Sequence, residues 1–100
     1  MYKNIVLFGD TVGVPQMIKH LPKDNLKAIV ASAVRPQYHS QLERLSKDLN
    51  MNFFIQPPFE SKNYQNFYNW FVDQNFDLLV CNCYSLIIRP DILQAITTMQ

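Results

Sequence analysis

The first residues that could do chemistry lie in the loop Gly9-Asp10-Thr11-Val12-Gly13, directly after an apolar run. Asp10 and Thr11 offer a carboxylate and a hydroxyl, and Gly9 and Gly13 allow a sharp turn and a close approach to a ligand. The loop lacks the three glycines of a dinucleotide fingerprint and the lysine of a P-loop, which disfavours NAD and ATP sites. The alternative is an ordinary strand-to-helix turn in which Asp10 or Thr11 caps the helix.

A second segment, from Asn82 to Arg89, is unusual because Leu86-Ile87-Ile88 is apolar although it follows a strand pattern and precedes Pro90. Apolar residues at a loop tip can line a pocket for a flat, partly apolar ligand. They can equally pack beneath the last helix, and the residues alone leave both interpretations open.

The cysteines and histidines do not match a known catalytic or metal-binding pattern. Cys81 and Cys83 would face the same way on an extended strand, but a metal site needs three or four ligands. Two small buried side chains near a strand end are therefore the favoured interpretation. His20 should end a helix and His39 should lie beside a helix start, and neither has a nucleophile at a recognisable spacing.

Composition narrows the class of protein. The chain has 100 residues, of which 48% are hydrophobic and 17% charged, so one small domain with a real core is expected. The net charge is +1 and the basic residues are scattered, which disfavours nucleic-acid binding. No apolar run approaches the ~20 residues of a membrane span, and the start lacks the shape of a signal peptide. The two cysteines form no disulfide framework, so a cytoplasmic location is expected.

Alternating apolar runs and helical spacings should position these loops. Strands are predicted at residues 5–8, 27–31, 52–55 and 77–80, with an extension of the last to residue 82 left open. Each is followed by a helix pattern: Val14 to Leu21 ended by Pro22, a capping box at Ser40 and Glu43, the stripe Tyr64, Phe67, Tyr68 and Phe71, and Ile92, Leu93 and Ile96 after Pro90.

The order βαβαβαβα with short, right-handed connections predicts a single α/β domain, with a Rossmann-like parallel sheet in the strand order 3-2-1-4. In that order the winding reverses between the first and fourth strands, and ligands of such sheets bind outside the carboxyl ends at the reversal. The two loops described above meet there. The fourth strand would be an edge, which makes a homodimer possible.

Three segments in order resemble the folate-dependent formyltransferases. Ile5-Val6-Leu7-Phe8-Gly9-Asp10-Thr11 resembles their opening, and Phe53-Ile55-Gln56-Pro57 resembles the segment after their third strand. Asp77-Leu78-Leu79-Val80 and Tyr84 to Leu93 resemble their fourth strand, folate-binding loop and next helix. The resemblance covers essentially the whole chain.

This resemblance implies an N-formyltransferase that moves a formyl group from 10-formyltetrahydrofolate to an amine. It implies that Ser85, Leu86, Ile87 and Ile88 bind the pterin-like ring, and that Gly9, Asp10 and Thr11 lie nearer the amine acceptor. The stretch from Cys83 to Ile88 is most similar to the branch that acts on nucleotide-linked amino sugars, with the methionyl-tRNA branch as the alternative.

The family's Asn-x-His motif has no counterpart here, because Gln37 precedes His39 and Ile18 precedes His20 at the asparagine position. The resemblance therefore implies the N-terminal part of a formyltransferase catalytic domain, inactive alone and continued by a strand ending in Asn-x-His. The alternative from another class is a non-enzymatic, flavodoxin-like ligand-binding domain.

Overall fold

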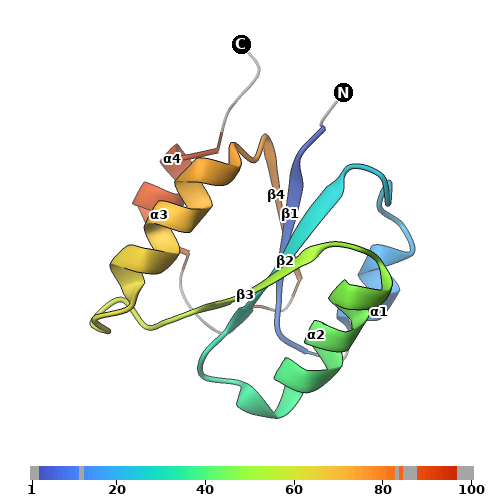
Figure 1. The fold of residues 1–100 in the computed structure, drawn as a ribbon, viewed down its shortest axis with the longest axis horizontal. Coiled ribbons are helices and arrows are strands. Elements are labelled where there is room, and N and C mark those ends of the chain that lie inside the picture. Colours follow the sequence, from blue (N-terminus) through green and yellow to red (C-terminus); the bar gives the residue numbers. More distant parts are fainter. Residues whose placement is uncertain (1–2, 12, 83, 85–87, 97–100) are drawn as a thin grey trace.

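The computed structural model of the chain describes residues 3–11, 13–82, 84 and 88–96 (Figure 1). The elements in chain order are β1 (Ile5–Gly9), α1 (Val14–Ile18), β2 (Leu26–Ser32), η1 (Pro36–Tyr38), α2 (His39–Asp48), β3 (Asn52–Gln56), α3 (Tyr64–Gln74), β4 (Leu78–Asn82) and α4 (Pro90–Gln94).

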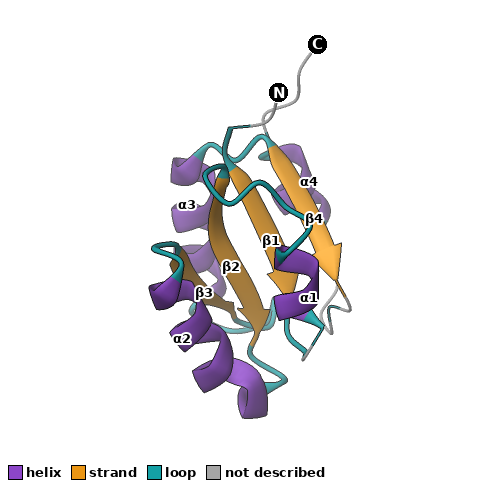
Figure 2. Ribbon diagram, turned by 90° about the vertical axis from the view of Figure 1, so that its right-hand side faces the viewer, coloured by secondary structure: helices purple, strands orange, loops and turns teal. Residues whose placement is uncertain are grey.

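The four strands form one sheet in the order β3-β2-β1-β4, and every pair is parallel. This confirms the α/β, Rossmann-like fold predicted from the alternation of strands and helices. Helices cover both faces, with α1 and α2 on one side and α3 and α4 on the other (Figure 2). β1 lies between β2 and β4 and is buried along its whole length, which explains its continuous apolar sequence.

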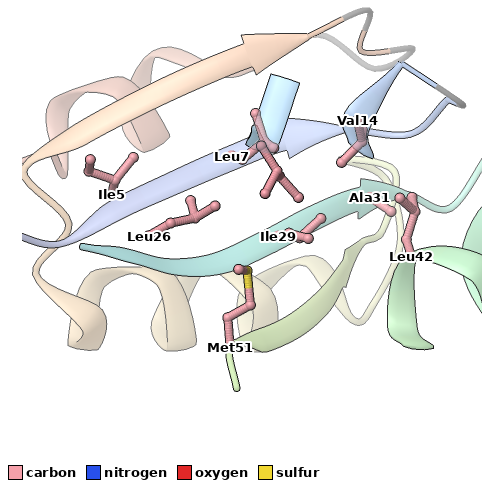
Figure 3. Close-up of a cluster of buried hydrophobic side chains, with 9 residues drawn as sticks. Ile5, Leu7, Val14, Leu26, Ile29, Ala31, Leu42 and Met51 are labelled. Atoms are coloured by element: carbon pink, nitrogen blue, oxygen red, sulfur yellow. The ribbon is translucent and has the colours of Figure 1, made fainter. Parts of the chain in front are cut away.

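Alternate residues of the strands feed two separate cores. Leu7 and Ile29 point to the face that carries α1 and α2, where they pack with Val14, Ile18 and Leu42 (Figure 3). Each such side chain contributes about 1.5–3 kcal/mol when it leaves water, so this core fixes α1 and α2 on the sheet.

The opposite core is largely aromatic. Phe67 and Phe71 of α3 are buried against Phe8 and Phe76, which confirms the apolar stripe predicted for this helix. Trp70, just off the stripe, stacks on Phe54 with ring centroids 4.4 Å apart. These rings bind α3 to the sheet over its whole length.

Two contacts hold α4 to the neighbouring elements. The Arg89 guanidinium lies 3.7 Å from the centroid of the Phe59 ring, and the Tyr64 hydroxyl donates to Oδ1 of Asp91 over 3.4 Å. Burial, and then the charge of Asp91, raise the pKa of Tyr64 to about 12. The hydroxyl therefore stays protonated and available as a donor at neutral pH.

The predicted capping box of α2 is wrong. The helix starts at His39 with Tyr38 as its N-cap, and no side chain caps it. Pro36 already begins a 3₁₀ turn that runs into α2, because its fixed φ suits a helical first turn. Ser40 therefore lies inside the helix, where it is exposed.

The predicted apolar face of the last helix is right only in part. Ile92 is fully buried and Ile96 packs against the same core, but Leu93 is 52% exposed. One residue further along a helix turns the side chain by about 100°, which carries Leu93 away from the core that holds Ile92. No helix within the described residues is long and apolar enough to cross a membrane.

Candidate functional site at the carboxyl edge of the sheet

The winding of the sheet reverses between β1 and β4, as the sequence predicted. These strands are neighbours in register, and Gly9 lies opposite Asn82 at their carboxyl ends. The loop after β1 and the segment after β4 therefore start from adjacent points of the same edge. This is the position at which open parallel sheets bind ligands.

Buried polar residues line the same edge. Phe8 pairs with Val30, so two residues further on Asp10 lies beside Ser32, and Ser32 pairs with Gln56 at the end of β3. All three side chains are almost completely buried. The Ser32 hydroxyl donates to Oδ2 of Asp10 over 2.6 Å. The strand register thus turns three residues far apart in sequence into one polar row.

Tyr84 follows the edge strand β4 and contacts Gln56, which ends the opposite edge strand β3. It packs edge-on against Phe8 with centroids 5.2 Å apart and donates from its hydroxyl to Oε1 of Gln56 over 2.5 Å. Burial, and then the charge of Asp10, raise the pKa of Tyr84. The phenol is therefore a neutral donor in the physiological range. We call Asp10, Ser32, Gln56 and Tyr84 the edge cluster.

His39 contacts the backbone of the edge cluster. Its Nε2 lies 2.7 Å from the carbonyl oxygen of Ser32. Because a carbonyl oxygen only accepts, this hydrogen bond requires the tautomer with a proton on Nε2. The prediction that His39 lies beside a helix start is confirmed. The contact ties the start of α2 to the end of β2.

Part of the loop after β1, from Thr11 to Gly13, makes the contacts of an ordinary strand-to-helix turn. The Thr11 hydroxyl accepts from the Gly13 amide over 3.3 Å, whereas the N-cap of α1, Gly13 itself, makes no side-chain cap. No described glycine has a positive φ, so the freedom expected of Gly9 and Gly13 is not used. The Asp10 carboxylate accepts from the Ser32 hydroxyl, whereas the Thr11 hydroxyl accepts from the Gly13 amide, so the two side chains have different partners.

Of the residues predicted to bind the cofactor, Ser85, Leu86 and Ile87 lie outside the described residues. Ile88 is half-buried and packs against the aromatic core that holds Phe8 and Phe67. Ile88 therefore packs in the core beneath the last helix, which is one of the two interpretations that the sequence left open for this segment. A half-buried side chain at this point also keeps an apolar surface beside the carboxyl end of β4.

The prediction of a buried cysteine pair is wrong for Cys81, which is exposed. The reason is topological, because β4 is an edge strand and Cys81 lies near its end. Cys83 lies outside the described residues. Among the residues that the structure describes, no group of three or more metal-ligating side chains occurs.

A groove of about 500 Å³ opens beside this edge, between the loop after β1 and α2. Thr11 and Pro15 lie on one side, and polar side chains of α2 that include Ser40, Arg44 and Asp48 lie on the other. The volume is within the range of small-molecule sites. The groove is separate from the edge cluster, but Thr11, which follows Asp10 in the loop after β1, lines it.

Sequence reasoning missed Ser32, Gln56, Tyr84 and the groove. The signal that could have found the first two is positional, because each is the last residue of a predicted strand or directly follows it, and carboxyl ends of parallel strands share one edge.

No family model, curated protein or solved structure matches the chain.

Proposed function

We propose that the chain is part of an N-formyltransferase that moves a formyl group from 10-formyltetrahydrofolate to an amine, preferably a nucleotide-linked amino sugar. One observation carries the proposal: two of the segments that resemble the family converge. Gly9 and Asn82 are register partners, so the loop after β1 and the segment after β4 leave the sheet side by side. Formyl transfer needs both, one for the acceptor and one for the folate.

On the folate side, the residues present fit in kind. Ile88 and Tyr84 bring apolar and aromatic surface to the carboxyl end of β4, as a flat ring requires. The resemblance assigns Ser85, Leu86 and Ile87, which lie outside the described residues, to the same ligand. Bound 10-formyltetrahydrofolate would supply the activated formyl carbon.

On the acceptor side, Asp10 is the residue with suitable chemistry. It is buried and already accepts a hydrogen bond from Ser32, so its orientation is set before any ligand arrives. A preset carboxylate lowers the cost of ordering when it accepts from an amine or hydroxyl of the acceptor.

The transfer also needs a donor for the developing oxyanion and a base for the attacking amine. His39 contacts the Ser32 carbonyl near β2, and His20 is exposed beyond the end of α1. Neither suits these roles, so on this proposal an Asn-x-His pair arrives on a strand that adds beside β4. The half-buried Leu79 and Val80 of that edge strand favour such an addition.

The test is folate binding, measured by calorimetry with 5-formyltetrahydrofolate as a non-transferring probe. Ile88→Asp should abolish binding, because an unpaired carboxylate buried against an apolar ring loses its hydration without compensation. Leu93→Asp is the matched control, since Leu93 is 52% exposed on the following helix. Absence of binding to the unsubstituted chain, or equal loss in both folded variants, would reject the folate assignment.

A ligand-binding domain without catalysis is the second candidate. It is favoured by the separate groove along α2, which needs no catalytic strand. Supplying the chain together with a downstream segment that bears Asn-x-His separates the two, because folate-dependent transfer to an amine is expected only for the enzyme.

A further inference from the structure

The groove lies between α2 and the chain from the loop after β1 to the start of α1, since Thr11 and Pro15 line it opposite α2. α1 spans five residues, less than two turns, and lies on the same face of the sheet as the longer α2 (Figure 2). The lining residues on α2 run from Ser40 to Asp48, and the groove measures about 500 Å³.

The floor and walls of the groove differ in chemistry. Leu45 is half-buried and packs against the core, so it gives the groove an apolar floor. Ser40 and Thr11 bring hydroxyls to one end, and Arg44 and Asp48 place opposite charges one turn apart along α2. A ligand that fits must therefore combine an anionic group with hydroxyl or amino groups.

Arg44 is the most informative residue. No described residue forms an ion pair with its guanidinium, although Asp48 follows it by one turn. A guanidinium carries five donors in a planar fork that matches the oxygens of phosphates and of carboxylates. Asp48 accepts only, so it suits sugar hydroxyls or an ammonium group.

We propose that this groove binds a phosphate ester of a sugar or a nucleoside, with the phosphate at Arg44 and Ser40 and the hydroxyl-bearing part toward Asp48. Such binding does not require formyl transfer. Within the proposed formyltransferase it would hold the phosphate-bearing part of the acceptor, because Thr11 belongs both to the groove and to the acceptor loop.

Two other pockets among the described residues lack this combination. A pocket of about 480 Å³ beside β3 is lined by Phe54, Ile55, Pro57 and Pro58 with uncharged polar neighbours. A smaller one, of about 350 Å³, is lined by apolar residues with His39 and Glu43. Only the groove along α2 presents an arginine among these three.

The experiment is an NMR titration of the ¹⁵N-labelled full chain with glucose 1-phosphate, uridine monophosphate, inorganic phosphate and glucose. We expect saturable amide shifts at Thr11, Ser40 and Arg44 with the two esters and little effect of glucose. A stronger response to one ester identifies a sugar or a nucleoside as the source of the phosphate. No saturable shift with either ester, or equal binding of glucose, would overturn the proposal.

Variants on α2 make the titration specific. Arg44→Gln should weaken ester binding by about tenfold, as expected for the loss of a charge-assisted hydrogen bond. Lys47→Gln removes the same charge from an exposed position of the same helix that does not line the groove, and should change binding by less than about twofold.

A second variant tests the space in the groove. Ser40 is exposed, so Ser40→Trp should fill the groove without disturbing the core, and its melting curve checks the fold. Loss of ester binding in folded Ser40→Trp supports the site. Equal effects of Arg44→Gln and Lys47→Gln, or full binding by Ser40→Trp, would contradict it, while the folate titration of Ile88→Asp stays informative by itself.

Discussion

The Tyr84 hydroxyl donates a 2.5 Å hydrogen bond to Oε1 of Gln56, so the segment after one edge strand contacts the end of the other. β4 and β3 are separated by β1 and β2 in the sheet, and Tyr84 therefore reaches across the carboxyl ends of both central strands. The same residue packs on Phe8. This bond closes the edge cluster and fixes one side of the candidate site.

Tyr84→Phe should destabilise the chain by about 1–3 kcal/mol, because it deprives the buried Gln56 oxygen of its donor. Urea unfolding monitored by circular dichroism measures the change. Tyr68→Phe is the control, since Tyr68 is only half-buried on α3 and should change stability by less than about 0.5 kcal/mol. If Tyr84→Phe is as stable as the unsubstituted chain, the hydrogen bond does not fix the edge cluster.

The fold was largely predictable, but the edge cluster was not, for a physical reason. Apolar runs such as 5–8 mark buried strands whatever their partners, and short connections then restrict the topology. The pairing of Asp10 with Ser32 depends on strand register, which shifts between Ile5 and Val6 and has no signal in the sequence. The exposure of Cys81 likewise depends on which strand forms the edge.

The hydrogen bonds of the Asp77 carboxylate predict how the free energy of unfolding depends on pH. Its carboxylate accepts from the amides of Lys3 and Asn4 over 2.9 and 3.0 Å. The Lys3 amide first, and the Asn4 amide with it, lower the pKa of Asp77. A depressed folded pKa means that the contribution is complete above the unfolded pKa of about 4 and is lost as the pH falls through the lower folded value.

We therefore expect Asp77→Asn to cost about 1 kcal/mol at pH 7 and nearly nothing at pH 2, because the hydrogen bonds are partly exposed. Unfolding free energies measured in urea between pH 2 and 7 give the two profiles. Asp73→Asn serves as the control, since Asp73 is exposed on α3. Parallel profiles for Asp77→Asn and the unsubstituted chain would contradict this role.

The edge strand β4 predicts self-association. Leu78, Leu79 and Val80 are only half-buried, and the strand carries no charged side chain that would discourage pairing with another chain. Sedimentation under reducing conditions should show dimers or larger species whose fraction rises with concentration.

A charge on that edge should prevent the pairing. Cys81→Lys places a lysine at an exposed position of β4 and should shift the equilibrium to monomers. Val72→Lys places a lysine at an exposed position of α3 and should leave the equilibrium unchanged. A strictly monomeric chain at high concentration would show that β4 does not recruit a partner strand.

Two buried serines give a sharper test of the edge cluster. Ser32 and Ser46 are both almost fully buried, and each hydroxyl donates one hydrogen bond, Ser32 to the Asp10 carboxyl over 2.6 Å and Ser46 to the Leu42 carbonyl over 2.8 Å. The two acceptors differ in the cost of losing the serine hydroxyl as a donor. A buried carboxylate deprived of a donor keeps its desolvation cost, whereas a carbonyl within α2 can still accept the bond of the helix itself.

Ser32→Ala should accordingly cost about 1.5–3 kcal/mol. Ser46→Ala should be close to neutral, since alanine favours a helix more than a serine that bonds back to the preceding turn. Chemical unfolding of both variants at pH 7 measures the difference, and calorimetric melting confirms it. Equal costs would show that the hydroxyl does not hold Asp10. In that case the orientation of Asp10 at the acceptor side would lose the support assigned to Ser32, even if the sheet itself were unchanged.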